Sequence, residues 1–98
     1  MIKICNLKDI KRNKINLFKV NGKKYLVLKI FNKISVLNNI CLHKGAPLEK
    51  GRIINNEIEC PWHGCRWNIF NGESIHNHMK IETYDYLEQK GELFLKNV

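Results

Sequence analysis

Two short segments decide how this chain of 98 residues folds: CLHKGAPLEKG at residues 41–51 and CPWHGCRWN at residues 60–68. In the first, Cys41 is followed by His43, and in the second Cys60 is followed by His63, with sixteen residues between the two pairs. A chain with 4 histidines places one at a given offset from a given cysteine only about one time in 25 by chance. Two such pairs, each beside glycine and proline, therefore predict one metal centre built from two loops.

Two thiolates and two imidazoles fit two kinds of centre. One is a tetrahedral structural zinc site. The other is a [2Fe–2S] cluster with two cysteines on one iron and two histidines on the other. Zinc modules usually pair cysteine with cysteine and histidine with histidine in successive turns. Here each turn supplies one of each, which favours the two-iron cluster and leaves zinc as the alternative.

Two further cysteines and a tryptophan need separate interpretation. Cys65 lies two residues past His63, and we interpret it as packing beside the centre rather than as a ligand. Cys5 is interpreted as a small hydrophobic residue near the first strand. Trp62 stands between two predicted ligands, where it either contacts a partner protein or packs over the loop.

The segments outside these loops predict short strands, because apolar and polar residues alternate and no stretch of ten residues keeps a helical period. The predicted strands are 2–5, 16–20, 25–31, 34–37, two within 52–59, 67–70, 81–87 and 92–96. Asn21-Gly22 is a strong hairpin signal, and Asn32-Lys33 is predicted to form a second turn. Only residues 8–14 could form a single helical turn. The sequence thus predicts one all-β domain over residues 1–98.

The charge of the chain bears on its partners and its location. The net charge is +8, but the basic residues are mostly lysines spread singly along the chain. Recognition of nucleic acid favours arginine and clustered charge, so we expect no nucleic-acid partner. An acidic protein partner fits better. The longest run of apolar or aromatic residues is 25–28, and the first six residues lack the apolar stretch of a signal peptide, so we expect a cytoplasmic protein without a membrane span.

The spacing Cys-x-His, sixteen residues, Cys-x-x-His resembles that of a Rieske iron–sulfur domain. The resemblance covers nearly the whole chain, and residues 40–72 are its specific part. It implies an antiparallel β-sandwich with a small cluster-binding subdomain formed by two loops. It also implies that Cys41 and Cys60 hold the inner iron. His43 and His63 would then hold the outer iron near the surface, where an electron can leave.

Within that family the chain resembles the soluble Rieske-type ferredoxins. The branch found in cytochrome bc complexes has a disulfide between its loops, and the matching positions here are Ala46 and Trp62. That branch also has serine and tyrosine hydroxyls near the cluster, where this chain has Cys65 and Trp67. Hydrogen bonds to cluster sulfurs raise the potential, so we expect a value near the low end of the range of about −150 to +300 mV. Segment 73–80 lacks the proline of the usual covering loop.

The resemblance implies a carrier of single electrons from a reductase to a terminal acceptor such as a non-haem iron oxygenase. We find no second ligand set of the kind that oxygenases use, and so expect no catalysis by the chain itself. The alternatives are a small Rieske-like subunit of a reductase complex, such as a nitrite reductase, a redox sensor, or a zinc-stabilised binding module.

Overall fold

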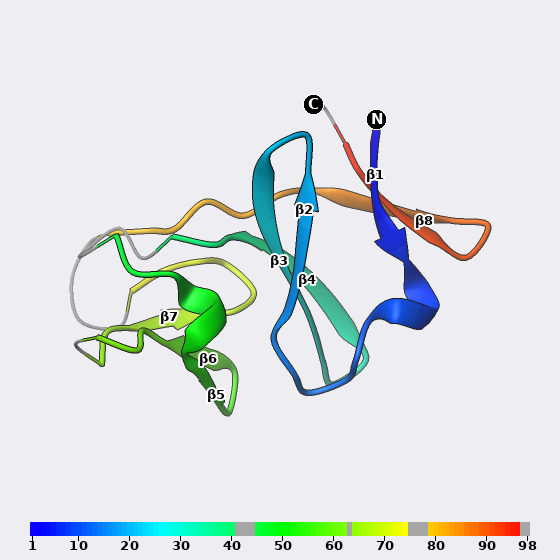
Figure 1. Ribbon diagram of the computed structural model, residues 1–98. Helices are drawn as coiled ribbons and strands as arrows, with labels where there is room; N and C mark the ends of the chain where they lie inside the picture. Colours follow the sequence, from blue (N-terminus) through cyan, green and yellow to red (C-terminus); the bar gives the residue numbers. More distant parts are fainter. Residues whose placement is uncertain (41–44, 63, 75–78, 97–98) are drawn as a thin grey trace.

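The computed structural model describes residues 1–40, 45–62, 64–74 and 79–96, which form three antiparallel sheets (Figure 1). Their strands are β1 (Ile2–Asn6), β2 (Asn16–Val20), β3 (Lys23–Ile30), β4 (Lys33–Asn38), β5 (Arg52–Ile54), β6 (Glu57–Glu59), β7 (Arg66–Asn68), β8 (Tyr86–Gln89) and β9 (Glu92–Leu95). Two 3-10 turns, η1 (Leu7–Asp9) and η2 (Leu48–Lys50), interrupt them. No helix in the described part of the chain has the length and apolar character to cross a membrane. The prediction of an all-β fold is confirmed.

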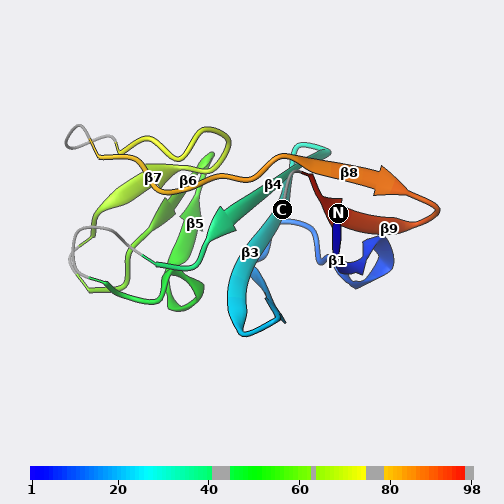
Figure 2. The same ribbon diagram turned by 90° about the horizontal axis from the view of Figure 1, so that it is seen from above.

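The central sheet has the order β2-β3-β4 and is buried on both faces. Tyr25 and Val27 of β3 pack with the sheet β1-β9-β8, whereas Leu26 and Leu28 point to the sheet β5-β6-β7. This explains why β3 contains a continuous apolar run, since strands covered on both faces do not alternate with polar residues. In Figure 2 the central sheet lies between the other two, so the larger sheets form the sandwich and β5-β6-β7 the small subdomain.

The hairpins follow the turn chemistry of the sequence with one shift. Asn21 and Gly22 have φ of 52° and 80°, as a two-residue hairpin turn requires, which confirms that prediction. The next turn consists of Phe31 and Asn32, with φ of 53° and 64°, and β4 already begins at Lys33. The predicted turn at 32–33 was therefore one residue too late, because Lys33 pairs with the last residue of β3 and extends the ladder.

The predicted strand 81–87 is wrong in its first half. Only β8 is a strand there, and residues 81–85 instead connect the small subdomain to the sandwich. Along this connection the Ile81 amide donates to the Gly72 carbonyl at 2.8 Å, and the Tyr84 amide donates to Val36 at 3.0 Å. The single helical turn expected within 8–14 lies earlier, at η1.

Gly72 is the position where this connection is most sensitive to substitution. Its φ is +77°, and a Cβ there would overlap the Ile81 carbonyl oxygen. We expect Gly72→Ala to lower the free energy of unfolding by about 2–4 kcal/mol, measured by urea denaturation. Gly91→Ala is the matched control, because Gly91 has φ +75° but open space around it and should cost only about 1 kcal/mol. Equal losses in the two variants would contradict the steric argument.

Candidate metal centre

The structure describes one of the four predicted ligands. Cys60 is buried at 2% exposure, whereas Cys41, His43 and His63 lie outside the described residues. Among the residues that are described, no group of three or more histidine, cysteine or acidic side chains is placed to hold a metal ion. The ligand set therefore stays a prediction, and the described surroundings show what would support it.

Backbone and side-chain bonds join the two ends of the first predicted ligand loop. Ile40 and Pro47 form an isolated antiparallel bridge, and the Leu48 amide donates to the Asn39 carbonyl at 3.2 Å. The buried Asn39 side chain accepts from the Glu49 amide at 2.8 Å and donates to the Glu49 carboxylate at 3.1 Å. Because a buried amide is costly without partners, this pairing holds the chain entering and leaving the loop in one arrangement.

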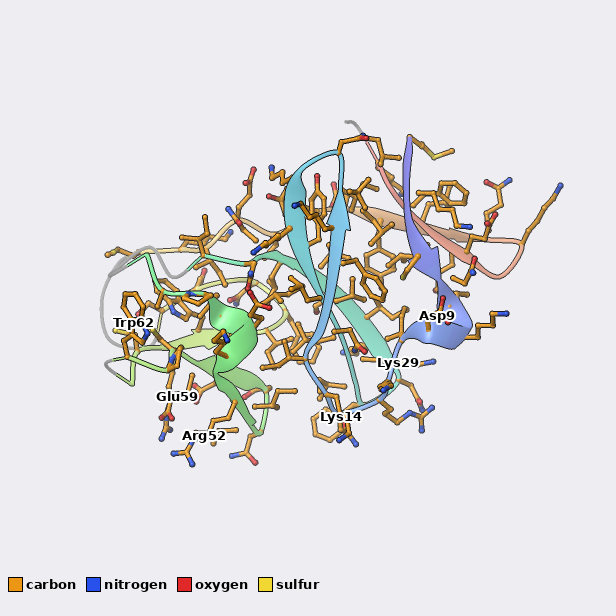
Figure 3. All side chains as sticks on the ribbon, viewed as in Figure 1. Asp9, Lys14, Lys29, Arg52, Glu59 and Trp62 are labelled. Carbon is orange, nitrogen blue, oxygen red and sulfur yellow. The ribbon has the colours of Figure 1, made fainter. Side chains whose placement is uncertain are left out.

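The second ligand loop is a tight turn between β6 and β7. The Cys60 amide donates to the Cys65 carbonyl at 2.7 Å, and the Gly64 amide donates to the Cys60 carbonyl at 3.3 Å. Cys60 thus sits at the buried base of the turn, while Trp62 at its tip is 59% exposed. Figure 3 shows Trp62 at the outer edge of the small subdomain. Of the two interpretations of Trp62, its exposure favours a contact with a partner.

Both loops rest on one hydrophobic core. Ala46 from the first loop packs in the same cluster as Cys60 and Cys65 from the second, together with the fully buried Trp67. Cys65 is 9% exposed, in keeping with a packing role. A thiol buried at the base of a tight turn fits a thiolate ligand of a metal cluster, because the surrounding core excludes water from one side of the centre.

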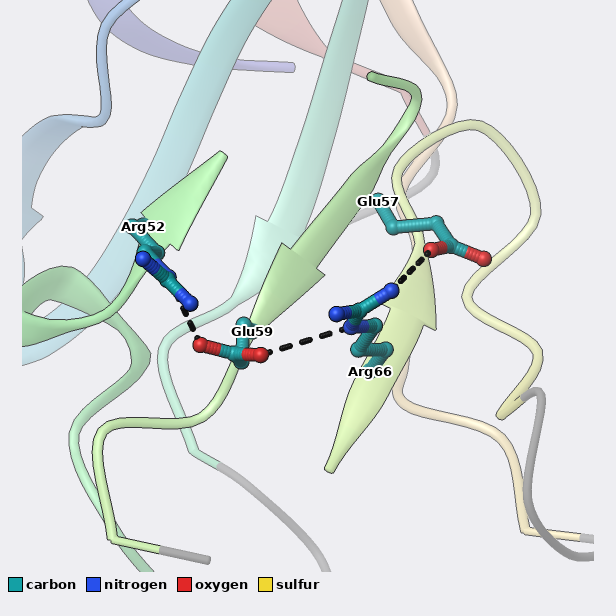
Figure 4. Close-up of polar contacts among 4 residues, drawn as sticks. All are labelled: Arg52, Glu57, Glu59 and Arg66. Atoms are coloured by element: carbon teal, nitrogen blue, oxygen red, sulfur yellow. Dashed lines mark hydrogen bonds and ion pairs between the residues drawn. The ribbon is translucent and has the colours of Figure 1, made fainter. Parts of the chain in front are cut away.

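A ladder of charged side chains crosses the small sheet beside the ligand turn (Figure 4). Arg52 Nε lies 2.7 Å from Glu59 Oε1, and Arg66 Nε lies 3.3 Å from Glu59 Oε2. Arg66 Nη1 also approaches Glu57 Oε1 at 3.7 Å. The hydrogen bond from Arg52, with that from Arg66, holds the pKa of Glu59 below its usual value. Since Glu59 precedes Cys60 and Arg66 follows Cys65, the ladder links both ends of the turn.

Comparison with known families and proteins identifies the family of this chain and several similar proteins. The model of the family "Rieske [2Fe-2S] domain" matches residues 1–85. The chain is 29% identical over 92 residues to the ferredoxin component of the naphthalene 1,2-dioxygenase/salicylate 5-hydroxylase systems of Ralstonia sp, and the match covers 92% of this chain and 88% of that protein.

Apoptosis-inducing factor 3 of Homo sapiens is 33% identical over 70 residues, which are 71% of this chain, but the chain spans only 12% of that protein's length. Among solved structures, a complex of reduced oxygenase and oxidized ferredoxin in carbazole 1,9a-dioxygenase matches with a TM-score of 0.83 and 22% identity. That match covers 96% of this chain and 99% of the other chain, so the two share a fold over nearly their whole length.

Proposed function

Because the chain belongs to the Rieske [2Fe–2S] domain family, we propose that it is a ferredoxin that carries single electrons from a reductase to an oxygenase or another terminal acceptor. The observation that carries this proposal is the similarity to a ferredoxin component of nearly the same length. The chain itself makes and breaks no substrate bond in this role. Its task is to hold one cluster, to set its potential and to present one edge of it to partners.

The family implies one Rieske-type cluster, which when bound takes up and releases one electron. We assign Cys41 and Cys60 to the inner iron and His43 and His63 to the outer iron. The buried Cys60 and the core shared by both loops support this assignment. Cys65 and Trp67 replace the hydroxyl donors that raise the potential in other branches, so the potential should lie near the low end of the Rieske range.

The charge of the chain supports an acidic docking face on its partners. With a net charge of +8, the carrier stays cationic even after reduction adds one negative charge. Complementary charge speeds encounter between redox proteins. The solved relative that pairs a ferredoxin with an oxygenase supports that class of partner. We place the carrier in the cytoplasm, since thiols remain reduced in that compartment until a cluster is inserted.

Anaerobic purification followed by metal analysis and EPR tests this proposal. We expect two irons and two sulfides per chain, and an EPR signal with a low average g value that appears only on reduction with dithionite. A redox titration on the same sample gives the potential. Stoichiometric zinc and no reducible signal would reject the carrier and favour a zinc-stabilised binding module. Stable co-purification with a large flavin or haem subunit would instead support the subunit of a reductase complex.

A further inference from the structure

A hollow of about 320 Å³ opens on the small subdomain beside the ligand turn. One wall comes from the end of η2 and the start of β5, with Lys50 and Arg52, and the other from the turn itself, with Cys60 and Pro61. The two walls can approach closely because Gly51 has no side chain, and a Cβ at this position would overlap the Glu59 carbonyl oxygen. The hollow therefore places two cationic residues next to a predicted ligand of the inner iron.

The hollow is lined by the cationic residues Lys50 and Arg52 and by the acidic residue Glu59, and these differ in exposure. The Arg52 side chain is 71% exposed, whereas its partner Glu59 is only 17% exposed. Lys50 is exposed at the rim. Glu59 is therefore less accessible than Arg52, and its ion pairs with Arg52 and Arg66 offset its charge. The accessible charges at the hollow are those of Lys50 and Arg52.

We propose that this cationic hollow is where the carboxylate side chains of an acidic protein partner dock. Arginine offers several donors in a fixed fork and binds carboxylates by charge-assisted hydrogen bonds. The hydrogen bond between Arg52 and Glu59 uses Nε of Arg52, and the Arg52 side chain as a whole is 71% exposed. A partner bound there lies on the turn at residues 60–65, whose sequence also contains His63, the predicted ligand of the outer iron. The inference rests on the proposed function and adds to it the surface that receives the partner.

Binding of a fluorescently labelled decaglutamate peptide, followed by anisotropy at low ionic strength, tests the hollow. The double variant Lys50→Gln/Arg52→Gln should weaken binding about tenfold, because two cations that face the peptide are removed. The glutamine at 52 can still donate to Glu59. The control Lys8→Gln/Lys90→Gln lowers the net charge equally at exposed positions far from the hollow and should change binding less than twofold (Figure 1). High salt should abolish binding of the peptide to the wild type and to both double variants, because it screens the charges.

The same samples separate failure of the hollow from failure of the function. In the reduced protein, each cluster passes one electron to ferricyanide, and bound decaglutamate should slow this oxidation in the wild type but not in the double variant. If the double variant loses its cluster, the single variant Lys50→Gln replaces it in both experiments. This change should leave the fold intact, since Lys50 forms no ion pair within the described residues. Absent binding, or equal weakening by both double variants, overturns the docking proposal. If the protein has no reducible cluster but still binds the peptide in a way that depends on Lys50 and Arg52, the docking proposal stands and the proposed electron-carrier function is rejected.

Discussion

Replacement of Cys60 by serine should abolish cluster binding, with iron and sulfide falling to near zero and the visible absorption lost. The thiolate is the ligand that iron–sulfur clusters require, and a serine hydroxyl is a harder and far less acidic donor. At 2% exposure, Cys60 is enclosed by the core, so water has little access to complete the coordination instead. Iron analysis, sulfide analysis and EPR of the anaerobically purified variant measure the effect.

Cys65→Ser is the matched control for this experiment. Cys65 is also buried and lies on the same turn, where its carbonyl accepts the bond from the Cys60 amide. Because that bond uses the backbone, it survives the substitution, and we expect the cluster to be retained. A Cys60→Ser protein with full iron content would exclude Cys60 as a ligand. If Cys65→Ser loses its iron and Cys60→Ser does not, Cys65 is the ligand and Cys60 is the packing residue, opposite to our assignment.

Trp67→Ala should lower the free energy of unfolding by about 3–5 kcal/mol, the cost expected for deleting a large aromatic side chain from a core. Trp67 is fully buried, pairs with Ile58 across β6 and β7, and packs in the core that supports both ligand loops. Such a loss is a large part of the stability of a small domain. Urea unfolding of the cluster-loaded protein, followed by circular dichroism and visible absorption together, gives both the stability and the retention of the cluster.

Trp67→Phe separates the volume of this side chain from its indole N–H. The Nε1 donor is buried and has no hydrogen-bond partner among the described residues. Its removal therefore breaks no described bond, and phenylalanine should cost less than about 2 kcal/mol. If the phenylalanine variant were as unstable as the alanine variant, the indole N–H would be essential, and the packing argument would be wrong.

Local chemistry made the hairpins predictable. Asn21-Gly22 has both residues at positive φ, and Lys90-Gly91 at the turn between β8 and β9 does the same. Such turns need only two adjacent residues that tolerate positive φ, so the residue types at these two positions are enough to predict them. The sequence does not predict a turn that begins at Phe31, because a bulky aromatic residue rarely adopts positive φ, and φ is 53° here.

The segment 81–85 shows where local pattern fails. Ile81 is buried and its neighbours alternate in polarity, which favours a strand. Its amide nevertheless bonds to Gly72, and only a single bridge, Thr83 with Leu37, joins it to the central sheet. A strand requires a continuous ladder of paired residues, and within the described residues the pairing with β4 does not extend beyond this bridge and its two hydrogen bonds. That information lies in distant residues and not in the segment itself.

By itself, the sequence determined the all-β class of the fold and predicted the ligands of the metal centre. The cysteine–histidine spacing is a local property, and so are the turn residues and the alternation of short strands. The tertiary structure alone decided that both faces of β3 are buried, that the two loops share one core, and that Arg52 is more exposed than Glu59. These features depend on sheet register and on packing between residues far apart in the chain, where small free-energy differences among many contacts select one arrangement.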